Sequence, residues 1–248
     1  MGFARHPAHH RALRGKASAH RHRHPGPRLP HRGRTPRPHP VKKLFIIGAG
    51  GFGREVYAWA RQHPDCGVRW EPAGFLDDNP SALKESGDFA PIAPLGGHRP
   101  AADSVYLNGL ALPELKQKLL PPLVSAGAEF LTFVHPAAKV GERVKLGRGV
   151  VLCPGAIVTS DASLGDFVVL NLRATVGHDA VVGAWTTANA HCDITGFVTV
   201  GESVFMGSRA SIIPGRKVGD GARLAAGAVV FNHVPAGVTV FGNPARPL

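Results

Sequence analysis

The sequence LGDFVV-LNLRAT-VGHDAV-VGAWTT-ANAHCD-ITGFVT, residues 164–199, repeats a six-residue pattern that decides the fold. Each unit begins with an apolar residue, and glycine often follows it directly. The same phase holds from Val134 to Val230, where seventeen successive sixth positions are all apolar. Such hexads predict one short strand and one corner per repeat, with a large apolar side chain and a small one four places later pointing inward.

This pattern resembles that of the hexapeptide-repeat acyltransferases. The resemblance implies a left-handed parallel β-helix with three hexads in each triangular coil, although parallel crossovers are normally right-handed. Seventeen hexads then make between five and six coils within residues 134–248. Their buried side chains offset only part of the entropy lost by about a hundred ordered residues, so we expect copies of the β-helix to pack together. The resemblance implies a homotrimer.

The first forty residues differ in composition from the rest of the chain. The net charge of +12 depends on them, because residues 1–40 contain ten Lys and Arg, eight of the fourteen His and no acidic residue. With almost nothing apolar to bury, this basic tail is predicted to be disordered. It could bind nucleic acid nonspecifically or bind metal, act as a targeting peptide, or be an unstructured extension with synthesis really starting near Val41. We favour the extension.

The cysteines indicate a reducing compartment. Cys66, Cys153 and Cys192 are odd in number and scattered, which argues against a disulfide framework. No apolar run approaches the length of a membrane span. We therefore expect a cytoplasmic protein without a membrane partner.

An α/β unit is predicted over residues 41–133. Val41–Ile47 is typical of a buried strand, Gly48–Gly53 of a glycine-rich turn and Arg54–Gln62 of a helix. A second strand, Val68–Leu76, ends in acidic residues. The N–H groups of such a turn can approach a phosphate, and a carboxylate after the next strand can hold a ribose. The sequence therefore predicts a Rossmann-like nucleotide-binding domain, for NAD or for a nucleotide-linked substrate.

The second half of this unit is less regular. Residues 81–100 are predicted to be a loop, and Val105–Leu110 a strand. A helix is expected over Pro113–Gly127, interrupted or restarted at Pro121 and Pro122 because proline removes a helical hydrogen bond.

The two parts together look like the sugar O- and N-acyltransferases of the sialic acid and bacillosamine type. The resemblance is carried by Gly48–Gly53 followed by Arg-Glu-Val, by Phe75–Asn79 (Phe-Leu-Asp-Asp-Asn) and by the hexads, and it covers nearly everything from Val41 to Arg246. In that family the small N-terminal domain holds the nucleotide end of a nucleotide sugar. The resemblance assigns this role to Gly50, Gly51, Asp77 and Asp78.

Acyl transfer from a thioester needs a base for the nucleophile and hydrogen-bond donors for the oxyanion. His178 lies two places after Val176, at an outward corner, and is either a solvated surface residue or functional. The resemblance implies that His178 is the general base, that Asp179 orients it and that Asn171 contacts the substrate. It also implies that Gly196, eighteen residues and one coil further on, offers its N–H to the thioester oxygen.

The same resemblance implies acetyl-CoA as co-substrate, bound on the coils between two copies of the β-helix. Cys192 should point inward, so we expect direct attack on the thioester rather than an acyl-cysteine. The residues predicted to bind acetyl-CoA are Thr187, Gly207, Ser208, Ala226, Gly227 and Arg246.

The favoured function is N-acetylation of a nucleotide-linked 4-amino-4,6-dideoxy sugar, with sugar O-acetylation as a close alternative. A zinc enzyme of the γ-carbonic anhydrase kind would use three His on the same fold, but the His spacings do not repeat by whole coils and no metal is expected. A non-enzymatic scaffold remains a further alternative.

Overall fold

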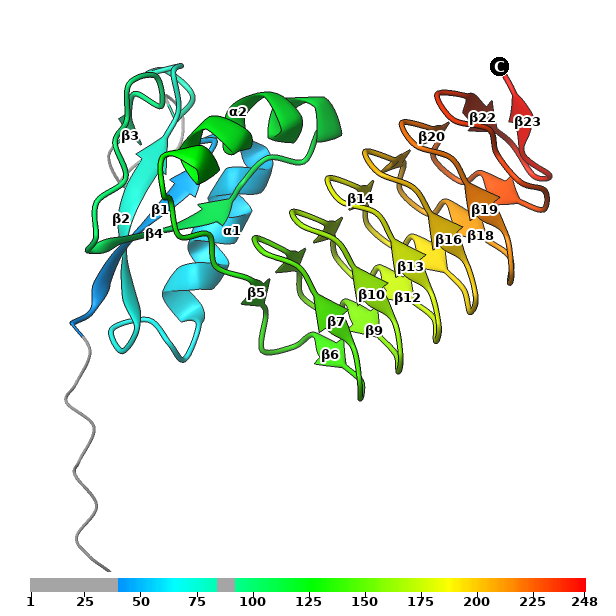
Figure 1. Ribbon diagram of the computed structural model, residues 1–248, viewed down its shortest axis with the longest axis horizontal. Helices are drawn as coiled ribbons and strands as arrows, with labels where there is room; N and C mark the ends of the chain where they lie inside the picture. The colour runs from blue at the N-terminus through cyan, green and yellow to red at the C-terminus, as the bar shows by residue number, and fades with distance from the viewer. Residues whose placement is uncertain (1–39, 84–91) are drawn as a thin grey trace, which may run out of the picture. The chain divides into compact units, whose positions relative to one another are not determined.

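The computed structural model describes residues 40–83 and 92–248. The predictions made for residues 1–39, including disorder of the basic tail, lie outside the described residues. Two parts follow one another along the chain, an α/β part and a β-helix (Figure 1).

The α/β part is a parallel sheet of order β3-β2-β1-β4. Its strands are β1 (Lys42–Ile47), β2 (Trp70–Leu76), β3 (Ile92–Ala93) and β4 (Ser104–Asn108), and its helices are α1 (Gly51–Gln62) and α2 (Pro113–Ser125). Alternate residues of β1 point to opposite faces, so Leu44 and Ile46 share a core with α1, whereas Ile47 shares a core with α2. The two helices therefore cover opposite faces of the sheet.

Helix α1 begins inside the glycine-rich turn, three residues earlier than the sequence predicted. Gly53 lies in the first turn of α1, where the helix passes close to the residue that follows β1. A Cβ on Gly53 would lie only 1.9 Å from the carbonyl oxygen of Gly48, so only glycine fits at this position. Gly48 itself has a φ of +93°, which favours glycine. Gly50 is the residue before the helix and carries no such constraint.

The expected interruption of the second helix is wrong, because α2 runs without a break through Pro121 and Pro122. Proline removes its own N–H but keeps its carbonyl, and the N–H of Ala126 bonds to the oxygen of Pro122. Buried Leu120 and Leu123 hold this stretch against the sheet.

The β-helix consists of short parallel strands on three faces, and we number the faces by the order in which the chain first reaches them. The first face contains β5 (Phe133–Val134), β8 (Val151–Leu152), β11 (Val169–Leu170), β14 (Thr187–Ala188), β17 (Phe205–Met206), β20 (Arg223–Leu224), β22 (Thr239–Phe241) and the antiparallel β23 (Arg246–Pro247). The second face contains β6 (Lys139–Val140), β9 (Ile157–Val158), β12 (Thr175–Val176), β15 (Asp193–Ile194), β18 (Ser211–Ile212) and β21 (Val229–Val230). The third face contains β7 (Lys145–Leu146), β10 (Ser163–Leu164), β13 (Val181–Val182), β16 (Thr199–Val200) and β19 (Lys217–Val218).

This architecture has the short strand and the corner in each repeat that the hexads predicted, and it fits the left-handed parallel β-helix that the resemblance implied. Strands pair with those eighteen residues away, as Val169 pairs with Thr187. Of the seventeen predicted inward residues, fourteen are buried in one core, and Val134 and Leu146 pack against it half-buried. Val140 is 40% exposed because it belongs to the first coil, which has no coil before it.

The corners place ordinary residues in the left-handed conformation. Asp179 has a φ of 57° and Phe197 a φ of 58°, and the same corner position of most other coils also has positive φ. This conformation costs an L-residue roughly 1–2 kcal/mol. Hydrogen bonds between coils offset part of that cost, as when the N–H of Phe197 donates to the carbonyl of His178 at 2.9 Å.

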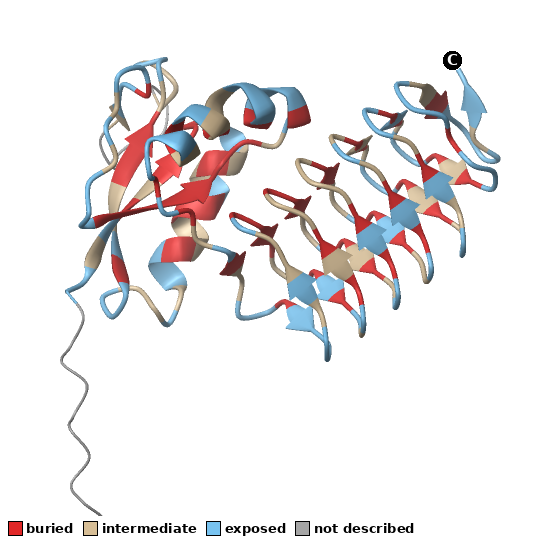
Figure 2. Ribbon diagram, viewed as in Figure 1, coloured by how far each residue is buried: buried red, intermediate tan, exposed pale blue. Residues whose placement is uncertain are grey.

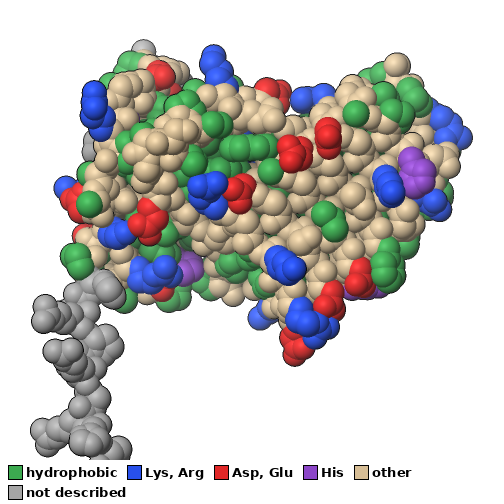
Figure 3. All heavy atoms as spheres, in the orientation of Figure 1, with side chains coloured by type: hydrophobic (Ala, Val, Ile, Leu, Met, Phe, Trp, Pro, Cys, Tyr) green, Lys and Arg blue, Asp and Glu red, His purple; other side chains and the backbone are tan. Residues whose placement is uncertain are grey.

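The α/β part packs on the first face of the β-helix. Val151 and Val169, which point outward from that face, belong to the same buried cluster as Leu44 and Val56 of the sheet and α1. Both residues of β8, β11 and β14 on the first face are buried, whereas most strands of the other two faces contain one buried inward residue and a more exposed outward one (Figure 2). On the side of the molecule seen in Figure 3, positive and negative side chains are interspersed over the β-helix. Among the described residues, no helix has the length and apolar character of a membrane span.

Candidate active site

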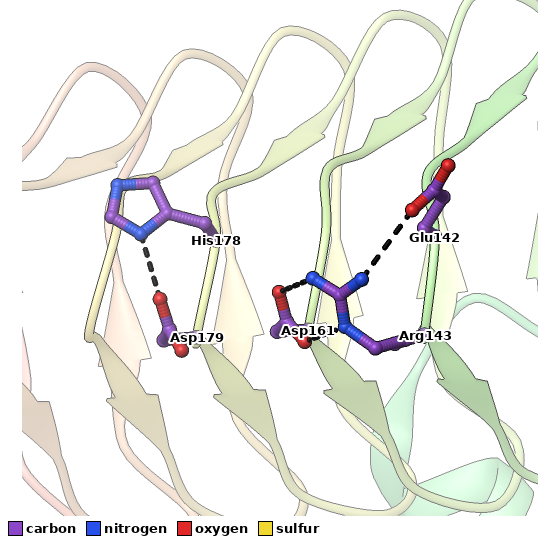
Figure 4. A network of polar contacts seen from close by, with 5 residues as sticks. All are labelled: Glu142, Arg143, Asp161, His178 and Asp179. Atoms are coloured by element: carbon purple, nitrogen blue, oxygen red, sulfur yellow. Dashed lines mark hydrogen bonds and ion pairs between the residues drawn. The ribbon is translucent and has the colours of Figure 1, made fainter.

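The candidate base lies at a corner between the second and third faces. His178 follows β12, and its Nδ1 lies 2.8 Å from a carboxylate oxygen of Asp179 (Figure 4). Since the carboxylate can only accept, Nδ1 carries the proton and the lone pair of a neutral ring is on Nε2. The imidazole is 55% exposed, so Nε2 is accessible.

Gly196 lies directly beside this ring. A Cβ added to Gly196 would be 2.7 Å from Nε2 of His178, closer than real Cβ contacts. Among the described residues no acceptor is paired with the backbone N–H of Gly196. The corner thus combines an accessible imidazole nitrogen, a glycine that leaves room for it and an unpaired donor.

The preceding coils extend the charge network at this corner. Arg143 donates two hydrogen bonds to Asp161, at 2.6 and 2.7 Å, and its guanidinium also lies near Glu142 (Figure 4). Asp161 occupies the same corner position as Asp179, one coil earlier. The hydrogen bonds and charge of Arg143 lower the pKa of Asp161 below its ordinary value. The positive charge of Arg143 therefore balances the negative charge of Asp161, which lies one coil before the His178–Asp179 pair.

Phe197 supplies an apolar wall at the same place. Its ring meets that of His178 edge to face, with centroids 4.9 Å apart and planes at 89°. The side chain is 62% exposed, which is unusual for a phenylalanine.

The predicted substrate contact and most of the predicted acetyl-CoA residues lie at a different corner, between the first and second faces. Asn171 is on the coil of His178, with β12 between them, and its side-chain oxygen accepts from the N–H of Leu172 at 2.6 Å. On later coils the same corner is lined by Gly207, Ser208, Ala226 and Gly227, of which the last three are exposed. Their small side chains leave a strip of accessible backbone along the corner.

Thr187 is a correction. The sequence placed it in the acetyl-CoA groove, but its side chain is fully buried under α2, where its hydroxyl accepts a hydrogen bond from Lys116 at 2.8 Å. It therefore contributes nothing to an open groove. Arg246 is exposed in β23 and lines a hollow of about 250 Å³ with Asn232 and His233.

The predicted nucleotide residues meet at the carboxyl ends of β1 and β2. Asp77 accepts hydrogen bonds from the N–H groups of Ala49 and Asn79, both at 2.8 Å, and so holds the glycine-rich turn. Asp78 accepts from the N–H of Gly96 at 2.7 Å.

Two adjoining clefts, of about 100 and 220 Å³, open at this edge of the sheet. Both are lined by Asp78, Leu95 and Leu119, and the smaller one also by Asp77 and Gly48. Gly50 and Gly51 are exposed at the start of α1, where no side chain caps the helix. This is the edge at which open α/β sheets bind ligands.

The two thiols of the β-helix, Cys153 and Cys192, are unsuited to covalent catalysis. Cys192 is buried, and loss of solvation raises its pKa to about 12. Burial also raises the pKa of Cys153. Within residues 40–83 and 92–248, no group of three His, Cys, Asp or Glu side chains could hold a metal ion.

Both the α/β part and the β-helix match known protein families. Residues 43–103 match the PglD N-terminal domain, and residues 197–232 match the hexapeptide repeat of succinyl-transferase. GDP-perosamine N-acetyltransferase of Escherichia coli O157:H7 is 29% identical over 210 residues, which cover 82% of this chain and 95% of that protein.

Two solved structures resemble the whole α/β and β-helix arrangement. The acetyltransferase domain of PglB from Neisseria gonorrhoeae FA1090, in complex with acetyl coenzyme A, has a TM-score of 0.75 and 29% identity, covering 84% of this chain and 100% of that one. PerB from Caulobacter crescentus, in complex with CoA and GDP-perosamine, has a TM-score of 0.73 and 28% identity, covering 84% and 98%. The chain matches the hexapeptide-repeat sugar acyltransferase family in both of its parts.

Sequence reasoning missed several residues of the candidate site. Arg143 and Asp161 could have been found by counting back in steps of eighteen from Asp179. Phe197 follows Gly196 directly and could have been noted as an apolar residue beside the base. Lys116 gave no signal, because a lysine on a helix is normally exposed.

Proposed function

We propose that this protein is an acetyl-CoA-dependent N-acetyltransferase that acts on a nucleotide-linked 4-amino-4,6-dideoxy sugar. The observation that carries the proposal is the corner at which Nε2 of His178 faces Gly196 while Nδ1 is held by Asp179. The named activities of GDP-perosamine N-acetyltransferase and the CoA and GDP-perosamine bound to PerB support the substrate classes.

In this proposal the amine of the sugar attacks the thioester carbonyl of acetyl-CoA. The N–C bond forms as His178 Nε2 takes a proton from the nitrogen, and Asp179 stabilises the imidazolium that results. The N–H of Gly196 donates to the oxyanion. The C–S bond then breaks, and the thiolate leaves without needing a strong acid.

The α/β part would hold the nucleotide. Backbone N–H groups at the start of α1, near Gly50 and Gly51, would meet the phosphates, and Asp78 would face the nucleoside. Asn171 would contact the acceptor. Acetyl-CoA would lie along the strip formed by Gly207, Ser208, Ala226 and Gly227, with Arg246 as a partner for its phosphates.

We infer a homotrimer, because apolar side chains remain exposed on the faces that the α/β part does not cover. Val181 on the third face is 46% exposed and Ile157 on the second face is 40% exposed. Together with Phe197 they flank the corner of His178. A neighbouring copy would cover this apolar surface and bring its acetyl-CoA strip toward the base.

Mass spectrometry of reactions with acetyl-CoA and GDP-, UDP- and CMP-linked sugars, with and without a free amine, tests the proposal. The expected result is a product heavier by one acetyl group with an amino sugar, which is lost in His178→Ala. Acetylation only of sugars that lack the amine would favour the O-acetyltransferase alternative. Binding without turnover of any acceptor would favour a scaffold.

A further inference from the structure

Lys116 of α2 is the one charged side chain among the buried polar residues of the described chain. It is fully buried, and burial lowers its pKa well below the ordinary value. Its Nζ donates to the carbonyl oxygens of Phe167 at 3.0 Å and Thr186 at 3.1 Å, and to the hydroxyl of Thr187 at 2.8 Å. Three acceptors match the three N–H groups of an ammonium.

These acceptors lie on two successive coils. Phe167 comes directly before the strands of the coil that carries Asn171 and His178, whereas Thr187 belongs to the next coil, where it pairs with Val169. That next coil carries Gly196. Lys116 therefore joins α2 to the two coils that form the corner of His178 and Gly196.

Helix α2 is also a wall of the nucleotide cleft. Leu119 lines both adjoining clefts beside Asp78, and Lys118 and Leu123 line the larger one. The helix thus contacts the cleft and these two coils at positions a few residues apart.

Apolar packing alone does not select these two coils. The first face repeats at the spacing of paired strands, about 4.8 Å, and its outward positions Val151 and Val169 offer similar apolar surfaces on successive coils. Thr187 is the next residue in this column and carries a hydroxyl. Directional hydrogen bonds to it distinguish its coil from its neighbours, and fixing register is the best-attested use of a buried charge.

We propose that Lys116 is a positioning residue that fixes the nucleotide cleft relative to His178, so that an acceptor bound by its nucleotide reaches the base. This inference rests on the proposed function. Lys116→Met leaves three buried acceptors without their donor, so it should also lower the free energy of unfolding. The loss that tests the positioning role is one of geometry, because a misplacement of about 1 Å can cost about a hundredfold in rate.

The test compares two acceptors in Lys116→Met and in the milder Thr187→Val. One acceptor is the nucleotide-linked amino sugar, and the other is the same amino sugar 1-phosphate without its nucleoside, which does not use the cleft. In Lys116→Met, kcat/KM for the nucleotide-linked acceptor is expected to fall about ten- to a hundredfold. The value for the shorter acceptor and the KM for acetyl-CoA should stay within about twofold. Thr187→Val should show a smaller loss in the same direction.

Glu114→Gln is the matched control, because Glu114 lies on the same helix and contacts Arg223 of the first face at 3.4 Å in an exposed ion pair. It should leave both acceptors unaffected. Equal losses for both acceptors in Lys116→Met, or no loss for either, would overturn the positioning role.

A crystal structure of Lys116→Met separates this inference from the proposed function. The α/β part is expected to shift along the first face relative to its place in the wild type. An unchanged position overturns the inference whether or not the wild type acetylates sugars. Lack of wild-type turnover with every acceptor overturns the proposed function alone.

Discussion

Gly196 and His178 are matched across one coil: a Cβ on Gly196 would lie 2.7 Å from Nε2 of the imidazole. Gly196→Ala should therefore push the ring aside and lower kcat by about a hundredfold with little change in Tm. Gly177→Ala is the contrasting variant, because its Cβ would lie 2.5 Å from the backbone nitrogen of Gly196. Backbone cannot rotate away, so this variant should lose stability first. Steady-state kinetics and thermal denaturation distinguish the two, and equal Tm losses would contradict the assignment.

Removing the base should cost rate without costing the fold. His178→Ala is expected to lower kcat by about 10² to 10⁴, the usual contribution of a positioned base. The 55% exposed side chain packs into no core, so the circular dichroism spectrum and Tm should be unchanged. Asp179→Asn should give a smaller loss, because an amide can still hold one ring tautomer. A His178→Ala enzyme with wild-type kcat would remove the general-base assignment.

The two acidic residues after β2 should behave differently. Asp77→Asn loses one of two acceptors that hold Ala49 and Asn79, so it should lower the free energy of unfolding by about 1–3 kcal/mol. Asp78→Asn keeps one oxygen for the N–H of Gly96 and should mainly raise the KM for the nucleotide sugar. Urea denaturation and kinetics with each substrate measure both effects. A raised KM for acetyl-CoA in Asp78→Asn would contradict this division.

Arg143→Met should lower the stability of the protein only at pH values at which the carboxyl of Asp161 is ionised. Arg143 lowers the pKa of Asp161 in the folded state, so the pair stabilises the protein above the ordinary pKa of the carboxyl. That contribution is lost as the pH falls through the lowered pKa. The Tm of the wild type should exceed that of the variant at neutral pH, and the gap should close once the pH is below the lowered pKa of Asp161.

Lys145→Met is the control for Arg143→Met, since it removes a positive charge from the neighbouring third face. Because Arg143 is exposed, added salt should also narrow the gap in Tm. A gap that is constant from neutral to acid pH would show that the ion pair does not stabilise the folded state.

Thiol labelling should find one reactive cysteine per native chain. Cys66 is partly exposed, whereas Cys153 and Cys192 are buried. With a pKa of about 12, Cys192 has a thiolate fraction of only about 10⁻⁴ at pH 8. Three thiols should react after unfolding in urea. Rapid native labelling of Cys192, or an acetylated cysteine trapped with acetyl-CoA, would reopen covalent catalysis.

The β-helix could be predicted because its signal is local and repeated. Each inward residue, such as Val176, is predicted from its own hexad. An irregular residue in one hexad therefore does not change the prediction for the next hexad. The exposed Val140 shows the limit, since the hexad does not say where the stack of coils begins. The strand, turn and helix at the start of the α/β part carried a similar local pattern, although α1 begins inside the glycines.

Contacts between the two parts could not be predicted in the same way. Thr187 occupies the outward position of its hexad and was expected to face a groove, but which face the α/β part covers depends on side chains far away in sequence. The same holds for Lys116, whose partners lie 51 to 71 residues further along the chain. The position of a residue within its repeat predicted whether its side chain points inward or outward. Whether an outward side chain is exposed or buried depends on the tertiary structure.

The winding of the β-helix also restricts how such a chain can change in length. Every inward side chain is placed by counting from the previous one, so inserting one residue within a strand would turn all later apolar residues of the stack toward solvent. Eighteen residues, by contrast, add one complete winding and leave all remaining pairings intact. Sequences that evolve from this one should therefore gain or lose whole coils of eighteen residues. Insertions of any other length should be accepted only as loops that extend from a corner.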